Sequence, residues 1–212
     1  MVTKKEDKKE HIIDTAERVF GEFGYEGAST RLLASEAGVN MAMLNYYFGS
    51  KDGLLRAVLE RRISSMRAVL EDIYQQPITN WQKLERMIEA YLNRVLTNNC
   101  FHRLVQRELS LAQRHDTADL ISEHVFLNLK VMRQVIVDGM ADGTFREVDA
   151  EMTIASVIGT KYYLLNSTDI LSRLLNADMQ DKVQLEEVIK PRVKKHLLSL
   201  LKSYLLKQNE EK

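Results

Sequence analysis

The amino-acid sequence predicts an all-α protein, with a small three-helix unit at the N-terminus and a larger helical unit after it. Only two prolines and nine glycines interrupt 212 residues, so long stretches contain no helix breaker. Apolar residues recur at spacings of three and four, which is typical of amphipathic helices, and no stretch alternates for long enough to suggest a sheet. We place the boundary between the two units at residue 50, which gives domains 1–50 and 51–212.

The composition indicates a folded cytoplasmic protein. Hydrophobic residues make up 45% of the chain and charged residues 28%, which is ordinary for a globular protein. No apolar run approaches the ~18 residues of a membrane span, and the charged N-terminus lacks the apolar segment of an export signal. The single cysteine, Cys100, has no partner for an intrachain disulfide, which fits a reducing compartment.

The first helix is predicted over residues 5–23. Gly24 follows it, and glycine tolerates the backbone conformations that end a helix. The apolar residues of this segment share one stripe, which we expect to face the core of the three-helix unit: Ile12, Ile13, Ala16, Val19, Phe20 and Phe23.

Residues 29–48 are predicted to form two short helices joined by a tight turn. Ser29 can cap the first, because its hydroxyl accepts a backbone N–H at the helix start. Gly38 follows the last apolar residue of that helix, where a left-handed residue must end it. Asn40 is a strong cap for the second helix, in which Leu44 faces inward. This is the pattern of a DNA-binding helix-turn-helix.

The second short helix has one face for the core and one for a partner. Leu44 and Phe48 are expected to pack on Leu33, while Met43 and Tyr47 lie at the margin between the two faces. For Tyr47, a structural role and a DNA contact fit equally well. The residues expected to point toward a major groove are Met41, Ala42, Asn45 and Tyr46. The alternative is an ordinary helical hairpin whose polar face is only solvated.

Three segments resemble the N-terminal domain of TetR-family transcriptional regulators: FGEFGYEG at residues 20–27, AGVN at 37–40 and YYFGSKDGLL at 46–55. The resemblance covers residues 8–60 closely and extends beyond them as a series of helices. It implies a sequence-specific DNA-binding regulator, a ligand-responsive repressor that binds a near-palindromic operator as a homodimer. A helical protein-interaction module that has lost DNA binding is the alternative.

The resemblance also assigns roles to residues. Arg31 is expected to reach a guanine, Asn45 and Tyr47 to touch phosphate, and Lys51 to anchor the next helix to the DNA backbone. The bases are expected to be contacted by Met41, Ala42, Met43 and Tyr46. The full set of expected DNA contacts is Thr30, Arg31, Asn40, Met41, Ala42, Met43, Asn45, Tyr46, Tyr47 and Lys51.

Two departures from the family pattern bear on specificity. Asn45 stands where the family usually has tyrosine, and Met43 stands where it usually has a small hydroxyl residue. Asn45 offers a bidentate contact to adenine, worth about 1–3 kcal/mol of discrimination. The operator sequence is therefore not inherited from a relative.

Net charge gives no independent support for DNA binding. The chain carries 30 basic and 30 acidic residues, and residues 1–60 carry eight basic and ten acidic ones. Most of these acids lie on the first helix and its exit, and we expect them to face away from DNA: Asp14, Glu17, Glu22 and Glu26. Phosphate contacts should therefore be few and the salt dependence of binding shallow. The four N-terminal lysines are either a phosphate-contacting arm or a solvated terminus: Lys4, Lys5, Lys8 and Lys9.

A long helix is predicted over Lys51–Tyr74, capped by Ser50 and ended before Pro77. It is the rigid connection between the two units that the sequence shows. Further helices are predicted over 80–96, 100–115, 117–141, from Asp149 onward, and from a point between residues 184 and 191 through 206. Pro191 either kinks the last helix or starts it.

The residue patterns of two of these helices predict self-association. One carries small residues at spacings that allow another helix to approach closely, and the last carries an apolar stripe too wide for one neighbour. We expect a four-helix bundle with the symmetry mates, although both stripes packing inside one monomer is the alternative. The expected interface residues are Ala155, Ser156, Gly159, Tyr163, Leu197, Leu201 and Tyr204.

The resemblance also implies a small-molecule effector bound within the second domain. No cofactor is expected, and without a long apolar run no membrane partner is expected either. The candidate pocket residues are Tyr91, Phe101, His102, Arg103, Gln106, Tyr162 and Tyr163. An enzyme is the competing class, but the chain has no His-Glu-x-x-His spacing, no glycine-rich phosphate loop and no Gly-x-Ser-x-Gly elbow. One further group follows no metal-ligand spacing, so no metal is expected: His102, Glu108, His115 and His124.

Overall fold

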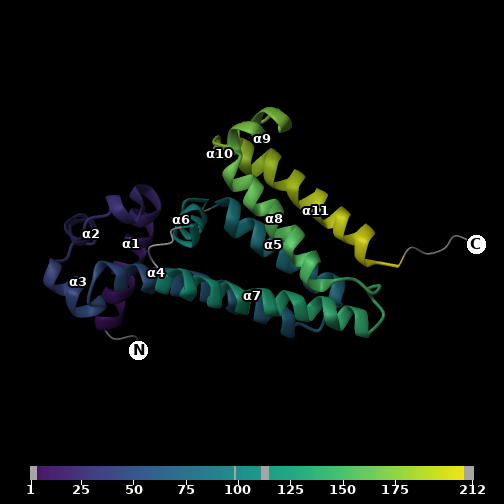
Figure 1. Ribbon diagram of the computed structural model, residues 1–212, viewed down its shortest axis with the longest axis horizontal. Coiled ribbons are helices and arrows are strands. Elements are labelled where there is room, and N and C mark those ends of the chain that lie inside the picture. The colour runs from purple at the N-terminus through teal and green to yellow at the C-terminus, as the bar shows by residue number, and fades with distance from the viewer. Residues whose placement is uncertain (1–3, 98, 111–114, 208–212) are drawn as a thin grey trace, which may run out of the picture. The chain divides into compact units, whose positions relative to one another are not determined.

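The computed structural model describes the backbone of residues 4–97, 99–110 and 115–207, and the side chains of 6–96, 101–110 and 116–207. The predictions for Lys4, Lys5, Cys100 and His115 concern side chains outside the described residues. The elements, labelled in Figure 1, are α1 (Lys4–Gly27), α2 (Thr30–Glu36), α3 (Met41–Phe48), α4 (Lys51–Gln75), α5 (Asn80–Thr97), α6 (Asn99–Ser110), α7 (His115–Ala141), α8 (Ala150–Asn166), α9 (Thr168–Leu175), α10 (Lys182–Gln184), the π-helical turn η1 (Leu185–Ile189) and α11 (Lys190–Leu205).

The all-α prediction is confirmed. Every regular element in the described part of the chain is helical, apart from one isolated antiparallel bridge between Phe145 and Leu206. None of the described helices is long and apolar enough to cross a lipid bilayer.

The helices form two compact units. The first comprises Met1–Ser65 and Cys100–Val125, and the second comprises Met66–Asn99 and Phe126–Lys212. The first unit thus extends past residue 50 to include the first part of α4, α6 from Cys100 onward and the start of α7. The functional boundary at residue 50 stays a prediction.

The first unit is built around the predicted stripe of α1. Ile12, Val19 and Phe20 are buried with the inner residues of α2, α3 and α4, and α6 adds Phe101 to the same core. Phe23 was expected in this stripe, but it is 48% exposed. The helical backbone breaks at Gly24, where φ is 68°, and the ring of Tyr25 instead stacks on Phe20 with centroids 6.0 Å apart.

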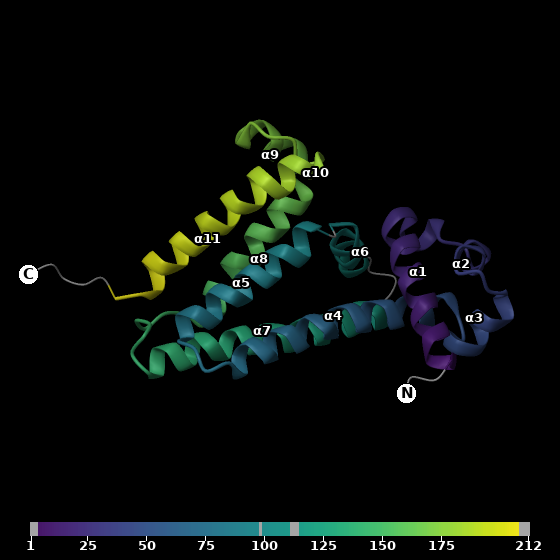
Figure 2. The same cartoon turned by 180° about the vertical axis from the view of Figure 1, so that it is seen from behind.

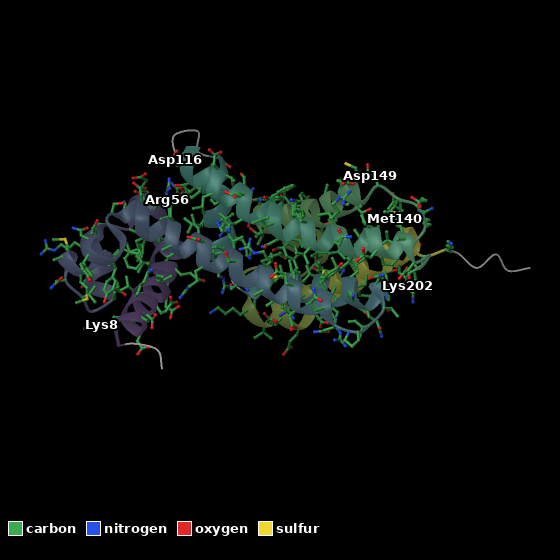
Figure 3. The ribbon with its side chains drawn as sticks, turned by 90° about the horizontal axis from the view of Figure 1, so that it is seen from below. Lys8, Arg56, Asp116, Met140, Asp149 and Lys202 are labelled. Carbon is green, nitrogen blue, oxygen red and sulfur yellow. The ribbon has the colours of Figure 1, made fainter. Side chains whose placement is uncertain are left out.

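An ion pair joins α4 to the start of α7 within the first unit. Arg56 and Asp116 point toward one another, as Figure 3 shows, and their charged groups are 3.1 Å apart. Because the Asp116 side chain is largely exposed, this contact contributes little stability.

The second unit packs α5, α8 and α11 around an apolar core. α11 lies beside α5 (Figure 2), and Lys194 of α11 forms an ion pair with Glu89 of α5 at 2.6 Å. Asp149 caps α8 as predicted, accepting a hydrogen bond from the N–H of Met152 at 2.8 Å. The short helix α9 was not predicted.

Of the two alternatives for Pro191, the structure has the second: it belongs to the first turn of the last helix. It lies at the start of α11, directly after the π-helical turn η1, and the helical path continues from Lys182 to Leu205. The N–H of Lys190 bonds to the carbonyl of Leu185, five residues back. Because proline cannot donate a hydrogen bond to the preceding turn, the wider turn before it accommodates its ring without ending the helix.

Candidate nucleic-acid interface

The two short helices α2 and α3 begin at the predicted caps. The hydroxyl of Ser29 accepts a hydrogen bond from the N–H of Leu32 at 3.1 Å, and the side chain of Asn40 accepts one from the N–H of Met43 at 2.8 Å. Gly38 has a φ of 62°, the left-handed conformation that the turn requires. The helix-turn-helix geometry is therefore fixed by local hydrogen bonds that the sequence specifies.

α3 buries only Leu44 and exposes a continuous face. Leu44 is 3% exposed, and Phe48 is half-buried against the same core. The opposite face carries Met41, 51% exposed, and Tyr46, 70% exposed. The exposed residues of α3 are Met41, Ala42, Asn45 and Tyr46, as predicted from the helical spacing, with Met43 half-buried at the margin.

Tyr47 lies between the core and the exposed face. Its ring packs edge-on against Tyr46 at a centroid distance of 5.2 Å, and it is half-buried against the core of the first unit. The ring of Tyr47 therefore packs against the ring of Tyr46, while part of the Tyr47 side chain stays exposed. Both the structural and the DNA-contacting interpretation of Tyr47 fit this position.

α2 places a cation beside the exposed face. Arg31 is exposed and forms no ion pair with any described residue. Thr30, the first residue of α2, is half-buried. A free guanidinium at the start of a helix next to α3 is suited to a phosphate or to the acceptor atoms of a guanine.

Lys51 is held more tightly than the resemblance implies. Its ammonium donates a hydrogen bond to the carbonyl of Tyr25 at 3.1 Å and lies 3.9 Å from the centroid of the Tyr25 ring. The hydroxyl of Tyr25 in turn donates to Asp52 at 2.6 Å. Lys51 therefore fastens the start of α4 to the end of α1, and only its remaining donors are available to a phosphate.

Three acids of α1 form ion pairs with arginines of α4 inside the first unit. Arg61 of α4 lies 2.9 Å from Glu10, 2.7 Å from Asp14 and 3.5 Å from Glu17, and Arg62 lies 3.4 Å from Glu17. Burial opposes the charge of Arg61, but the hydrogen bonds that the guanidinium donates to Glu10 and Asp14 outweigh it and raise its pKa. The charge count over residues 1–60 leaves out Arg61 and Arg62, so it overstates the negative charge of the first unit.

The predicted pocket residues fall into two groups. Phe101, His102, Arg103 and Gln106 lie on α6 in the first unit, where Phe101 is 3% exposed and belongs to the core. The ring of Phe101 fills space between buried side chains of this core, and its pocket role stays a prediction. In the second unit, Tyr91 and Tyr162 lie together at Lys161, whereas Tyr163 faces a groove beside α11.

The predicted interface residues are also divided by burial. Ala155, Ser156 and Gly159 are exposed on α8, and a Cβ added to Gly159 would meet nothing within 4 Å. Leu197 and Leu201 are each 2% exposed and fill the core of their own chain, and their part in a dimer interface stays a prediction.

The exposed apolar residues next to these helices are Met152, Tyr163, Leu200 and Tyr204. They border two open grooves of about 700 and 570 Å³ between α8 and α11.

The sequence analysis missed Lys161 as a functional candidate. The sequence does contain a signal for it, because Lys161 is the one charged residue between Met152 and Asn166 in α8. Among the residues whose side chains are described, no group of three or more histidines and acids could hold a metal ion, and His115 lies outside that set.

Comparison with known proteins gives two family matches. Residues 12–58 match the family described as bacterial regulatory proteins, tetR family, and residues 81–191 match the tetracyclin repressor-like C-terminal domain. The HTH-type transcriptional repressor NicS of Pseudomonas putida is 27% identical over 187 residues, covering 82% of this chain and 83% of its own.

Two solved structures share the fold. The fatty acid degradation regulator FadR of Bacillus halodurans superposes with a TM-score of 0.72 at 21% identity, covering 90% of this chain and 94% of its own. FadR of Bacillus subtilis, solved in complex with stearoyl-CoA, superposes with a TM-score of 0.71 at 19% identity, covering 90% and 97%. At this level of identity the likeness shows the fold alone.

Proposed function

The chain belongs to the TetR family and is a transcriptional regulator with a helix-turn-helix DNA-binding domain, and from this premise we propose that it is a ligand-responsive repressor. In this proposal it binds a near-palindromic operator as a homodimer, and a small molecule in the second unit releases it. A cytoplasmic location is part of the same proposal, since its DNA partner lies there. The relatives it matches are transcriptional regulators, in line with the expectation that it is not an enzyme.

The exposed face of α3 carries the proposal. In α3 only Leu44 is buried in the core, and the side chains of Met41, Asn45 and Tyr46 are exposed on a helix capped by Asn40. Exposing large apolar side chains to water costs free energy, so a face that carries them suggests that a binding partner covers it. A helix of this width fits the major groove, where Asn45 can bond to adenine and Met41 can contact a thymine methyl.

The faces of α8 and α11 support the homodimer. Gly159 and Ser156 allow a second helix to come close, and Tyr163 and Tyr204 offer apolar area beside an open groove. A two-fold axis through this face would repeat α3 on the other side of the dimer. Two copies of α3 separated by one or more helical turns, ~34 Å each, require a near-palindromic site.

Release by an effector needs a difference in affinity between two conformations. A ligand shifts the equilibrium only by as much as it prefers the conformation that cannot bind DNA, and a tenfold preference corresponds to about 1.4 kcal/mol of coupling. NicS is named a repressor, and one FadR was solved with an acyl-CoA, which supports the same scheme for this chain.

DNA binding is tested by fluorescence anisotropy on a labelled duplex from upstream of the protein's own gene. We expect Arg31→Ala to weaken the complex, while Arg173→Ala, which removes an exposed arginine of α9, leaves it unchanged. Binding that is equal in the wild type and in Arg31→Ala would contradict the contact assignment. No binding by the wild type to any duplex of that region would favour a helical interaction module without DNA binding.

Self-association is tested by analytical ultracentrifugation. The variant Gly159→Leu adds a side chain where the single chain has open space, so it should fold normally but dissociate into single chains. Ala141→Leu, at an exposed position at the end of α7, is the matched control and should stay dimeric. A wild-type mass equal to one chain would refute the dimer.

A further inference from the structure

A lysine in the second unit occupies an unusual position. Lys161 is half-buried on α8, and its ammonium lies 4.2 Å from the ring centroid of Tyr162 and 5.8 Å from that of Tyr91 on α5. No carboxylate among the described side chains forms an ion pair with it. Removal from water lowers its pKa to about 8, so at neutral pH most molecules carry this charge without a counterion.

A second polar group nearby also lacks a partner. The hydroxyl oxygen of Tyr91 is buried, and it has no hydrogen-bond partner among the described residues. Burial, with a smaller contribution from Tyr162, raises the pKa of Tyr91, so the hydroxyl keeps its proton and remains a donor. An unsatisfied buried hydroxyl costs free energy, so its presence calls for an explanation.

The two groups share a requirement. The ammonium of Lys161 can only donate hydrogen bonds, and the hydroxyl of Tyr91 has its proton available to donate. Both groups therefore need an oxygen acceptor. The ammonium favours an acceptor with negative charge. Apolar core residues flank both groups along their helices: Ile88, Leu92 and Val95 on α5, and Ile158 and Leu165 on α8. Apolar side chains of this kind suit the hydrocarbon part of a ligand.

We propose that Lys161 and Tyr91 bind the anionic oxygen of an amphipathic effector, whose hydrocarbon part lies against the apolar side chains of α5 and α8. This assignment rests on the proposed effector response and names the chemical class of that effector. A carboxylate is the simplest such group, because its oxygens accept hydrogen bonds from both donors at once. The rings of Tyr91 and Tyr162 hold the lysine in place by cation–π contact while no ligand is bound.

The test compares three probes that differ only at the head group. Decanoate carries the carboxylate, methyl decanoate replaces it with a neutral ester, and decanoyl-CoA carries its negative charge on phosphates. Each is titrated by isothermal calorimetry into the wild-type protein, Lys161→Met and Tyr91→Phe. Lys130→Met is the matched control, since Lys130 also lies over an aromatic ring, 5.0 Å from the centroid of Phe126, but at an exposed position of α7.

The expected pattern is specific. Decanoate or decanoyl-CoA binds the wild type, and Lys161→Met weakens that binding roughly tenfold or more, as for other charge-assisted hydrogen bonds. Tyr91→Phe weakens it less, Lys130→Met has no effect, and methyl decanoate binds more weakly than the anionic probe that binds. Which of the two anionic probes binds identifies the source of the charge.

Two results would overturn the proposal. One is binding of the anionic probes to Lys161→Met and Tyr91→Phe as tight as to the wild type. The other is no binding of any of the three probes to a wild-type protein that still binds its operator, which leaves the proposed repressor intact. Should Lys161→Met not fold, Tyr91→Phe, which removes one unpaired oxygen, still decides the question. A protein that binds decanoate through Lys161 but no DNA would contradict the proposed repressor alone.

Discussion

Replacing Lys161 by methionine is expected to make the protein more stable at neutral pH, even though it removes a charge that we assign to effector binding. Methionine fills a similar volume but has no ammonium to desolvate. The burial of Lys161 lowers its pKa from 10.5 to about 8. Each pKa unit corresponds to about 1.36 kcal/mol. Allowing for the partial exposure of the side chain and for the lost cation–π contacts, we expect a net gain of about 1–2 kcal/mol at pH 7.

The pH dependence has a definite sign. Below pH 8 the lysine is protonated in both the folded and unfolded states, so the wild type carries its full desolvation cost. Between pH 8 and 10.5 the unfolded state binds the proton more tightly, so the stability of the wild type rises with pH. The advantage of Lys161→Met should therefore be constant below pH 8 and shrink as the pH approaches 10.5.

Trp81 makes this measurement selective. It is the single tryptophan of the chain, lies on α5 and packs against the core of the second unit, so its fluorescence in urea reports the unfolding of that unit. Lys130→Met should show neither the gain in stability nor its pH dependence. A Lys161→Met variant that is less stable than the wild type at pH 7 would refute the reasoning, because Lys161 would then be stabilising the fold.

Three further substitutions test local geometry by thermal or urea unfolding. Gly38→Ala should cost about 1 kcal/mol, because its φ is 62° but an added Cβ would meet nothing within 4 Å, and an unchanged midpoint would exclude strain at this turn. Gly139→Ala should cost about 2–3 kcal/mol, because its Cβ would lie 2.2 Å from the buried ring of Phe145, and a neutral effect would mean that this ring can move aside. Asn40→Ala should cost about 1 kcal/mol through loss of the cap on Met43, whereas Asn40→Asp, which keeps the acceptor, should not.

The features that the sequence predicted well are those set by neighbouring residues. The caps at Ser29, Asn40 and Asp149 and the left-handed turn at Gly38 depend on side chains within three residues, so residue type and spacing are enough to locate them. The exposed face of α3 followed from helical periodicity once Leu44 was placed inward.

The features that the sequence did not predict depend on contacts between distant segments. Arg61 neutralises acids 44 to 51 positions before it in the chain, so a charge sum over one segment could not show the pairing. The burial of Leu197 and Leu201 is decided by which helices lie beside α11, and a wide apolar stripe does not reveal that. The contact between Lys161 and Tyr91 joins two residues that are 70 positions apart in the chain.

The central claim is that the exposed face of α3 binds DNA, and Tyr46→Ala tests it most directly. Tyr46 is 70% exposed, so its removal should leave the unfolding midpoint nearly unchanged. Phe126→Ala, which removes another exposed aromatic ring from the second unit, is the control. In an anisotropy titration on the operator duplex, we predict that Tyr46→Ala binds roughly tenfold more weakly or worse, while Phe126→Ala binds like the wild type. Equal affinities for all three proteins would contradict the assignment of α3 as the DNA-binding helix.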